Sequence, residues 1–236
     1  MAEKVRRIDQ ILSSYGYCSR SEARAWIRHA RVTIDDQPVK APEEKHPVSR
    51  VRIDGAPVDS PHGLLVLLHK PAGYVCSRDA AEGQSVYELL PPRWSRRNPP
   101  LTTVGRLDRD TTGVLLLTDL GELVQRWTSP RHKTPKLYDV TVDTPLRADL
   151  VSNFASGDLR LAGEEKACLP ATLQILDPHH ATLQLIEGRY HQVKRMFAHH
   201  GHQVLKLHRS KFGEFDLTGL NPGQWKILPL PTDITP

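Results

Sequence analysis

The residues best suited to chemistry lie in one polar loop, GRLDRDTTG at 105–113, between two apolar runs typical of β-strands. The loop carries the carboxylates of Asp108 and Asp110 and the guanidinium of Arg106 at strand ends, where proteins commonly display catalytic groups. An ionised carboxylate in such a place can act as a nucleophile, stabilise a cation or transfer a proton. Aspartates are also common turn formers, so a purely structural loop is the alternative.

The same loop approaches the spacing of a calcium-binding loop, which needs oxygen ligands at alternate positions and a bidentate glutamate at the twelfth. Thr112 stands at the fifth position and Asp119 at the twelfth, and the VLLLT between them is typical of a buried strand. Such a strand cannot wrap around an ion. The sequence therefore predicts no calcium site here.

A second group of candidates lies in EGRYHQVKRMFAHHGHQVLKLHRSKFG. Val193, Met196, Phe197 and His200 share one helical face, and Gly201 would end that helix. The histidines invite a metal site, but no cysteine or paired glutamate accompanies them, so we predict none. The cations fit contacts to phosphate better; they are Arg189, Lys194, Arg195, Lys206, Arg209 and Lys211. Spacing alone does not say which of them faces an active site instead.

Two further segments carry weaker signals. In HKPAGYVCS, at 69–77, a strand-like run leads into a turn with Lys70 and Tyr74, which alone predicts no specific chemistry. The loop PPRWSRRNPP at 91–100 is rich in proline and arginine. Proline disfavours both a helix interior and a central strand, so we predict a mobile basic arm.

The N-terminal part predicts two short amphipathic helices that Gly16 separates. A capping box of Ser19 and Glu22 would start the second helix. The apolar stripes at helical spacing are Ile8, Ile11, Leu12 and Tyr15 in the first helix and Ala23, Trp26, Ile27 and Ala30 in the second. Each stripe predicts a buried face.

Basic residues crowd one side of the second predicted helix. Arg20, Arg24, Arg28 and Arg31 fall within roughly an 80° arc beside its apolar stripe, with no acid among them. Solvated faces usually mix charge signs, because like charges repel one another. This arginine face therefore favours binding of RNA or DNA over a merely solvated surface.

Short strands and a linker follow the two helices. VTIDDQPVK and VRIDGAPVD alternate apolar and polar residues, with turns at Asp35-Asp36 and Asp54-Gly55. The stretch DSPHG at 59–63 is typical of a linker, and the rest mixes strand-like runs with fewer helical ones. We predict an α+β protein with a small domain at 1–59 and a larger domain at 60–236.

Composition narrows the class of protein. Of 236 residues, 39% are hydrophobic and 25% charged, and no apolar run approaches the roughly 18 residues of a membrane helix or the core of a signal peptide. Cys18, Cys76 and Cys168 are too far apart in sequence for a zinc knuckle or a disulfide framework, which fits a reducing cytoplasm. The net charge of +5 suits a polyanionic partner.

Residues 6–58 resemble the RNA-binding domain first seen in ribosomal protein S-four. Its pattern of Arg-Leu-Asp, Ser-Arg-Ser-Glu-Ala and Val-x-Val is matched by RRID, SRSEARAWI and RVTID. Ala30 and Asp36 stand where that domain often has glycine. Neither belongs to the arginine face.

Together the three clusters resemble the pseudouridine synthase family, in the branch with an S-four domain in front of the catalytic domain. GRLDRDTTGVLLLT, HKPAGYVCS and EGRYHQVKRM match three family motifs, with His69 in place of the usual Asn. RWTSPRHKTPKLYDV and VLKLHR are close to the subgroup that modifies 16S rRNA, and large-subunit rRNA is the alternative target.

The resemblance implies a fold and a set of roles. The fold is a mixed, mostly antiparallel catalytic sheet flanked by helices. Asp108 is the expected catalytic nucleophile and Tyr138 the active-site phenol. Lys194 is expected to pair with Asp108 and favour its ionised form, while Arg106 fills the space that a flipped base leaves. The remaining expected RNA contacts are Arg20, Arg24, Arg28, Arg31, Lys70, Arg189, His191, Gln192 and Arg195.

The implied reaction isomerises one uridine of ribosomal RNA to pseudouridine, and because no group is lost it needs no cofactor or metal. The expected form is a cytoplasmic monomer with ribosomal RNA, or a small-subunit assembly intermediate, as its partner. A non-catalytic ribosome assembly factor and a hydrolase that releases uracil are the alternatives. The presence of Asp108, Tyr138 and Lys194 favours catalysis over the assembly factor, whereas the hydrolase would use the same aspartate with a water in place of the rejoining base.

Overall fold

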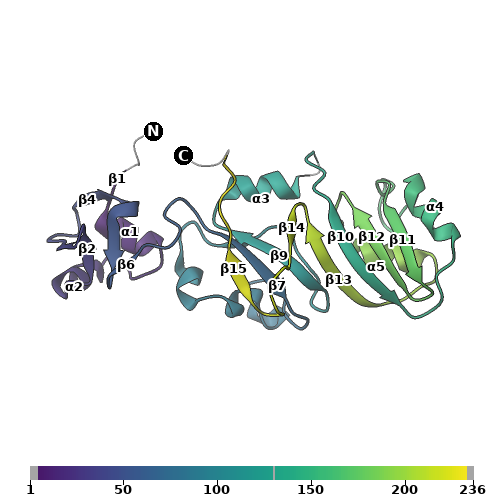
Figure 1. The fold of residues 1–236 in the computed structure, drawn as a ribbon, viewed down its shortest axis with the longest axis horizontal. Coiled ribbons are helices and arrows are strands. Elements are labelled where there is room, and N and C mark those ends of the chain that lie inside the picture. Colours follow the sequence, from purple (N-terminus) through teal and green to yellow (C-terminus); the bar gives the residue numbers. More distant parts are fainter. Residues whose placement is uncertain (1–4, 130, 233–236) are drawn as a thin grey trace.

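A computed structural model describes residues 5–129 and 131–232, in two parts that lie end to end (Figure 1). Each part has its own hydrophobic core. The first part buries one cluster between Ile8 and Val58, and the second buries a large cluster that begins at Leu64 and a smaller one that includes Leu67, Val114 and Phe212. Within the described residues, no helix is long and apolar enough to cross a membrane.

The N-terminal part packs two short helices on short strands. Helix α1 (Ile8–Ser14) and helix α2 (Ala23–Arg28) bury most of the predicted stripes, but Trp26 is only partly buried and Ala30 lies exposed beyond α2 with φ of 53°. The strands are β1 (Val5–Arg7), β2 (Val32–Ile34), β3 (Gln37–Pro38), β4 (Lys45–Pro47), β5 (Val51–Ile53) and β6 (Ala56–Pro57), with the 3-10 helix η1 (Val48–Arg50). Strands β3, β2, β5 and β6 form one antiparallel sheet, and β1 pairs with β4.

Local sequence signals fix the turns of this part. Asp35 and Asp36 both have positive φ and join β2 to β3, and Asp54-Gly55 does the same between β5 and β6, so both predicted hairpins are confirmed. The two hydrogen bonds of the predicted capping box are present, from the Glu22 amide to Ser19 Oγ at 3.3 Å and from the Ser19 amide to Glu22 Oε2 at 2.7 Å, but α2 begins at Ala23 with Glu22 as its N-cap.

The second part is built on one large sheet. Its strands are β7 (Leu65–Lys70), β8 (Thr102–Thr103), β9 (Thr112–Thr118), β10 (Lys136–Val142), β11 (Thr172–Asp177), β12 (His180–Leu185), β13 (Val204–Phe212), β14 (Phe215–Asp216) and β15 (Trp225–Ile227). The order is β11-β12-β10-β13-β9-β7-β15, with β14 on β13 and β8 on β9. All pairs are antiparallel except β9 with β13, so the predicted mixed, mostly antiparallel sheet is confirmed.

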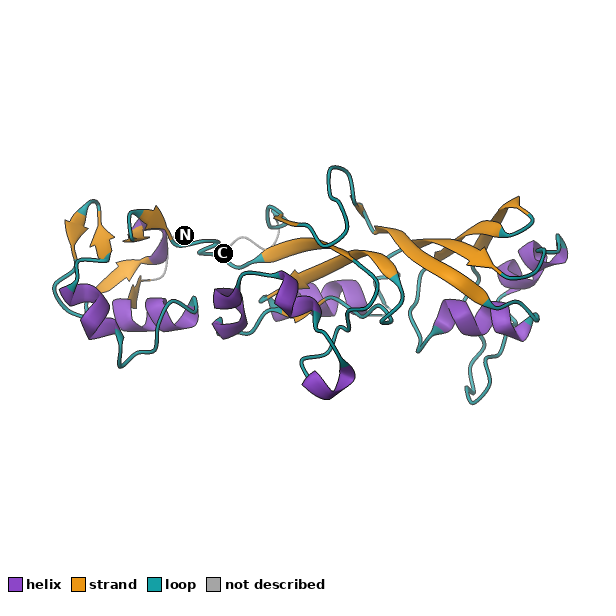
Figure 2. Cartoon of the chain, turned by 90° about the horizontal axis from the view of Figure 1, so that it is seen from below, coloured by secondary structure: helices purple, strands orange, loops and turns teal. Residues whose placement is uncertain are grey.

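Most helices of this part lie on one side of the sheet (Figure 2). They are α3 (Gly121–Thr128), α4 (Asp149–Ser156) and α5 (Gln192–His199), with the 3-10 helices η2 (Ala80–Glu82), η3 (Val86–Leu89) and η4 (Pro92–Arg96). Helix α5 buries the predicted face of Val193, Met196 and Phe197, and Gly201 follows its end with φ of 83°. Strand β9 includes the VLLLT run, which confirms that this run is a strand.

One glycine lets the parallel strands meet. Gly113 is opposite Arg209 in the β9–β13 pair, with φ of +116°. A Cβ at this position would lie 2.2 Å from the Arg209 carbonyl oxygen, far inside van der Waals contact. Glycine is therefore required both for the backbone conformation and for the close approach of the two strands.

The predicted mobile basic arm at 91–100 is wrong. Residues 92–96 form the 3-10 helix η4, and Trp94 and Arg97 are buried. Arg93 donates two hydrogen bonds of 2.8 Å to the Asp59 carboxylate, and Trp94 Nε1 donates a third of 2.6 Å. The sequence signal misled because proline also suits 3-10 turns and because the acidic partners of the arginines lie far away in the chain.

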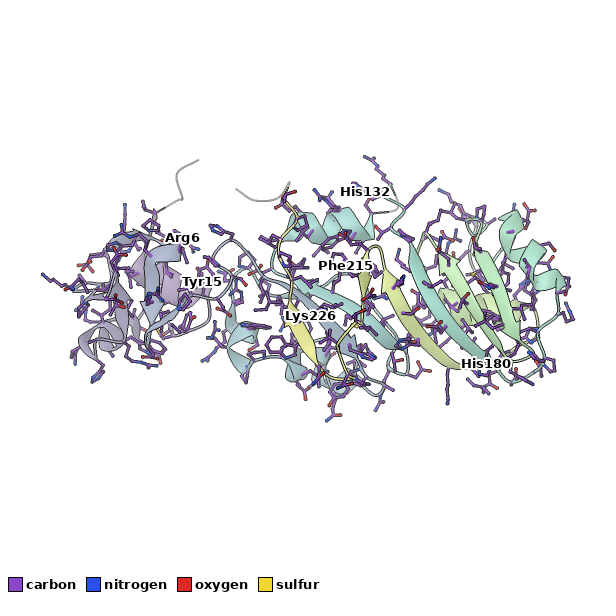
Figure 3. The ribbon with its side chains drawn as sticks, in the orientation of Figure 1. Arg6, Tyr15, His132, His180, Phe215 and Lys226 are labelled. Carbon is purple, nitrogen blue, oxygen red and sulfur yellow. The ribbon has the colours of Figure 1, made fainter. Side chains whose placement is uncertain are left out.

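This segment joins the two parts of the molecule. The Asn98 amide donates to the Ser14 carbonyl at 2.8 Å, and the Tyr15 hydroxyl donates to the Pro61 carbonyl at 2.6 Å. Tyr15 lies on the side of the N-terminal part that faces the large sheet (Figure 3). Arg97 in turn donates to the buried Asp119 carboxylate at 2.6 and 2.9 Å. Hydrogen bonds therefore join the two parts, and the buried Arg97–Asp119 ion pair fixes the joining segment to the second part.

Candidate active site

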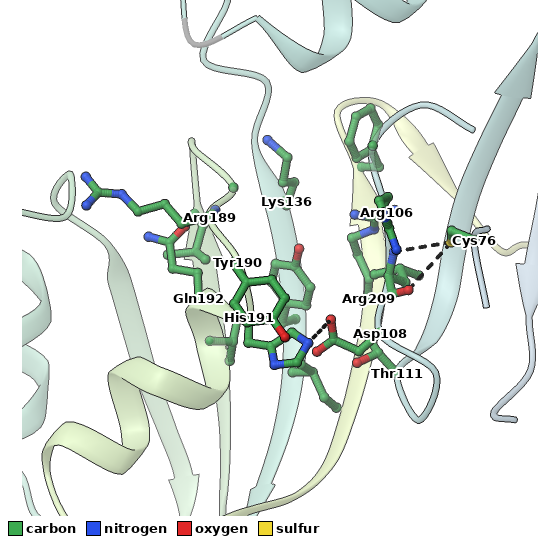
Figure 4. A pocket seen from close by; sticks show the side chains of 18 of the residues that line it. Cys76, Arg106, Asp108, Thr111, Lys136, Arg189, Tyr190, His191, Gln192 and Arg209 are labelled. Atoms are coloured by element: carbon green, nitrogen blue, oxygen red, sulfur yellow. Dashed lines mark hydrogen bonds and ion pairs between the residues drawn. The ribbon is translucent and has the colours of Figure 1, made fainter. Parts of the chain in front are cut away.

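A cavity of about 630 Å³ opens on the large sheet (Figure 4). Its wall is made by the loop 105–111, strands β10 and β13, and the turn 188–193 that leads into α5. Asp108, Tyr138 and His191 all line it. Three segments that are distant in sequence thus bring their polar side chains to one hollow.

Asp108 lies in the loop between β8 and β9, and Cys76, in the segment after β7, holds that loop in place. Leu107 is buried, and its amide donates to Cys76 Sγ at 3.4 Å while the thiol donates back to the Leu107 carbonyl at 3.5 Å. Burial raises the pKa of the Cys76 thiol, so the cysteine stays neutral and serves as a hydrogen-bonding anchor. The side chain after this anchor, Asp108, points into the cavity (Figure 4).

Two basic groups contact the Asp108 carboxylate. Lys194 Nζ lies 3.2 Å from Oδ2, and His191 Nε2 lies 3.3 Å from Oδ1. The side chain of Asp108 keeps 23% of its surface exposed, as an atom that must meet a substrate requires. The carboxylate therefore lies between a lysine and a histidine at the cavity wall.

Lys194 also contacts Asp110, at 2.6 Å. Burial alone would raise the pKa of Asp110 and lower that of Lys194, but their hydrogen bond reverses both shifts. The Asp110 side chain is 71% exposed, so solvent weakens this shorter contact. Asp110 thus positions the ammonium, while the more sheltered Asp108 receives its charge inside the cavity.

Tyr138 reaches the cavity from strand β10. It pairs in register with Leu183 of β12 and Arg209 of β13, so strands on both sides fix its backbone. The side chain is 8% exposed and lines the cavity. The phenol is therefore placed for contact with whatever the cavity holds.

The family model described as RNA pseudouridylate synthase matches residues 64–199, a range that includes Asp108, Tyr138 and Lys194. The chain belongs to this family. An S-four domain model matches residues 6–45. The predicted family and the S-four domain are both confirmed, and the protein is an enzyme of the pseudouridine synthase class.

Relatives of nearly full length support the same family. The ribosomal small subunit pseudouridine synthase A of Yersinia pestis is 40% identical over 225 residues, which cover 94% of each chain. The protein of the same name from Escherichia coli is 40% identical over 227 residues, which cover 94% of this chain and 96% of that one. A crystal structure of pseudouridylate synthase aligns with a TM-score of 0.65 and 35% identity, covering 94% of this chain and 96% of the other, and confirms the fold class.

Arg106 extends from the rim of this pseudouridine synthase cavity. Its side chain is 71% exposed and lies 3.6 Å from Glu82, an ion pair that solvent screens. The guanidinium is thus free to leave Glu82 and insert elsewhere.

Lys70 is not an RNA contact, contrary to the sequence prediction. It is fully buried, and its ammonium donates to the carbonyls of Pro71, Arg109 and Thr111 at 3.1, 3.2 and 2.7 Å. Burial lowers its pKa to about 8. Lys70 instead ties the turn after β7 to the loop that carries Asp108.

Arg189, Gln192 and Arg195 are also poor candidates for RNA contact, because protein groups already engage them. Arg189 pairs with Glu164 at 2.6 Å and with Glu187 at 3.1 Å, and Arg195 pairs with Glu164 at 2.6 Å. Gln192 is buried and donates to Glu187 at 2.6 Å. This network fastens the loop at 162–167 to the start of α5, and so fixes the turn that carries His191.

Two of the four arginines of the arginine face form ion pairs with acidic residues. Arg20 lies 3.1 Å from Asp9 of α1. Arg31 pairs with Asp54 at 2.6 Å, and its guanidinium lies 3.6 Å from the ring centre of Trp26. Acids distant in sequence therefore neutralise both ends of the face. Arg24 and Arg28 are exposed and form no ion pair within residues 5–129 and 131–232.

Sequence reasoning missed three residues of the site: Cys76, Lys136 and Tyr190. Cys76 holds the loop with Asp108 through a hydrogen bond to Leu107, and because the two residues are distant in sequence no local pattern reveals this contact. Lys136 lines the cavity two residues before Tyr138, and burial lowers its pKa to about 8. An aromatic residue inside a basic motif is the sequence signal that points to Tyr190, and its ring is exposed in the structure.

The histidines near the end of α5 have other partners. His202 is buried and shares a hydrogen bond of 2.8 Å with Thr144, and His200 packs its ring on Phe154. Across the part of the chain that the structure describes, no three His, Cys, Asp or Glu side chains group as metal ligands.

Proposed function

We propose that this pseudouridine synthase converts one specific uridine of 16S rRNA to pseudouridine, with Asp108 as the nucleophile. The observation that carries the proposal is the Asp108 carboxylate, held 3.2 Å from Lys194 inside a cavity that Tyr138 also lines. The choice of RNA rests on the small-subunit enzymes that share 40% of this sequence.

The reaction detaches uracil and rejoins it through a different atom. The bond between a uracil nitrogen and the ribose breaks, the ring turns, and carbon five of the ring bonds to the same ribose carbon. A proton leaves carbon five and the freed nitrogen gains one, so the atoms balance without a co-reactant. The Asp108 carboxylate, 3.2 Å from Lys194, bonds transiently to the nucleoside, either at the ribose or at the uracil ring, and this bond breaks as the product forms.

Tyr138 supports the later steps. Its ring lies at the cavity wall, where it can stack on the turning base. Its oxygen can take the carbon-five proton, directly or through water, as the hydroxyl passes its own proton on to water.

The cavity is reached by base flipping. A uridine within folded RNA must leave its stack, at a cost of a few kcal/mol. Arg106 stands at the rim with a mostly exposed side chain, and its insertion into the vacated space would offset part of that cost.

We assign residues 1–59 to RNA anchoring and residues 60–236 to catalysis. The separate cores support this division. Arg24 and Arg28, exposed on α2, would supply phosphate contacts that do not depend on base sequence. We further propose that the protein acts as a cytoplasmic monomer; its three buried free cysteines fit a reducing compartment.

Treating small-subunit rRNA with the protein, naked and in partly assembled particles, tests the proposal. Pseudouridine is mapped by reverse-transcriptase stops after carbodiimide treatment, with Asp108→Asn as the inactive control. We expect one stop in small-subunit rRNA, given by the wild type alone. A stop only in large-subunit rRNA would overturn the target, free uracil would indicate hydrolysis, and tight binding without product would indicate an assembly factor.

A further inference from the structure

Tyr190 exposes an aromatic ring at the entrance of the catalytic cavity. Its surface is 76% exposed, the largest fraction among the large apolar side chains of residues 5–129 and 131–232. The neighbouring turn residues Arg189 and His191 line the same cavity as Tyr190. An aromatic ring left in water beside a substrate site is a candidate for contact with that substrate.

One face of the ring is already occupied. The rings of Tyr190 and His191 stack with centroids 3.9 Å apart and an interplanar angle of 16° (Figure 4). His191 in turn contacts Asp108 at 3.3 Å. The stack therefore connects the entrance of the cavity to its catalytic carboxylate, and the outer face of Tyr190 is the one that a ligand can meet.

The backbone beneath the ring is held firmly. Arg195 donates to the Tyr190 carbonyl at 3.1 Å, and the Arg189 amide donates to Gln192 Oε1 at 3.0 Å. His191 adopts a left-handed conformation with φ of 46° that the network on both sides maintains. Because its backbone and one face are already fixed, the ring loses little conformational freedom when it contacts a ligand, so less binding energy is spent on ordering it.

We propose that Tyr190 is a stacking platform for an unpaired nucleobase adjacent to the target uridine. The inference rests on the proposed function, in which the target uracil itself enters the cavity beside Asp108 and Tyr138. Tyr190 lies at the entrance, so the base that it meets belongs to a neighbouring nucleotide.

The surroundings favour a nucleobase over an apolar protein side chain. Arg106 and Arg109 line the same cavity with exposed side chains, and their positive charge suits the phosphates on either side of a stacked base. Base–aromatic stacking changes affinity by roughly 5- to 150-fold per base. This contact forms before and during reaction alike, so its loss should appear in KM and RNA affinity more than in kcat.

Three variants test the platform. Tyr190→Leu removes the aromatic face, Tyr190→Phe keeps it, and Leu176→Ala alters an exposed side chain of β11 as a matched control. KM, kcat and RNA affinity are measured with the RNA in which the wild type forms pseudouridine. We expect KM and the dissociation constant to rise at least 5-fold for Tyr190→Leu, with kcat within 3-fold and the other two variants like the wild type.

A double-mutant cycle then locates the base. The same RNA is made with an abasic residue at each nucleotide flanking the target uridine. At the neighbour that stacks on Tyr190, the abasic RNA should bind wild type and Tyr190→Leu equally. If wild type forms pseudouridine and Tyr190→Leu keeps the wild-type KM and affinity, the platform is refuted while the proposed function stands. If wild type forms no pseudouridine, the proposed function itself fails.

Discussion

Replacing Gly113 by alanine should damage the molecule far more than one methyl group suggests. The new Cβ would lie 2.2 Å from the Arg209 carbonyl oxygen, whereas real Cβ contacts essentially never fall below 3.0 Å. Strands β9 and β13 must therefore separate by roughly 1 Å, which breaks hydrogen bonds of their short parallel ladder at about 1 kcal/mol each. The positive φ adds about 1 to 2 kcal/mol. We expect the free energy of unfolding to fall by about 3 to 5 kcal/mol.

Activity should fall as well, because β9 begins directly after the loop that carries Asp108. A shift of about 1 Å in a catalytic group can reduce the rate about 100-fold. Urea unfolding followed by tryptophan fluorescence gives the stability, and single-turnover pseudouridine formation gives the rate.

The matched control is Gly201→Ala, in the same part of the chain. Gly201 also has a positive φ, of 83°, but nothing lies within 4 Å of its would-be Cβ. This variant should lose only about 1 to 2 kcal/mol, from backbone conformation alone. If Gly113→Ala is no less stable than Gly201→Ala, close approach of the strands is not what requires glycine at 113.

Two further predictions concern charge. Asp119→Asn removes the carboxylate 2.6 Å from the buried Arg97 and leaves Asp59, at 3.7 Å, as its nearest acid. The free energy of unfolding should therefore fall by about 3 kcal/mol. An unchanged urea midpoint would contradict this. Replacing both Arg24 and Arg28 by glutamine should flatten the slope of log binding constant against log salt by roughly 1.5, while Arg147→Gln, on the opposite part of the chain, should leave it unchanged. An unaltered slope in the double variant would mean that the arginine face does not bind phosphate.

Local patterns predicted the local structure well. The stripe of Ile8, Ile11 and Leu12 is buried, as its helical spacing predicts. The two-residue turns occur at Asp35-Asp36 and Asp54-Gly55, as the sequence predicts. Positive φ at Asp36 shows that aspartate serves there in place of the glycine common in the S-four domain. These features depend on neighbours within a few residues, which a single sequence displays.

Partners across the chain were beyond the reach of such patterns. The sequence shows Lys70, Arg189 and Arg195 only as cations in basic motifs, and a motif does not reveal whether a carbonyl or a carboxylate from another segment will engage them. The family resemblance identified Asp108 and Lys194 as a pair, and the observed contact of 3.2 Å agrees with it. Burial and charge pairing therefore determine which of these cations already have partners within the protein.

Activity should depend on the pairing of β9 with β13, which joins segments that are far apart in the sequence. Lys194 contacts Asp110, 84 residues away in sequence, and Arg209 donates to the Val114 carbonyl, 95 residues away. Contacts of such long range form late, after the shorter hairpins have closed. A chain released from synthesis before β13 can dock on β9 would hold every catalytic side chain and yet have no catalytic site. Pseudouridine formation is for this reason a sensitive reporter of whether the whole second part of the molecule has reached its native state.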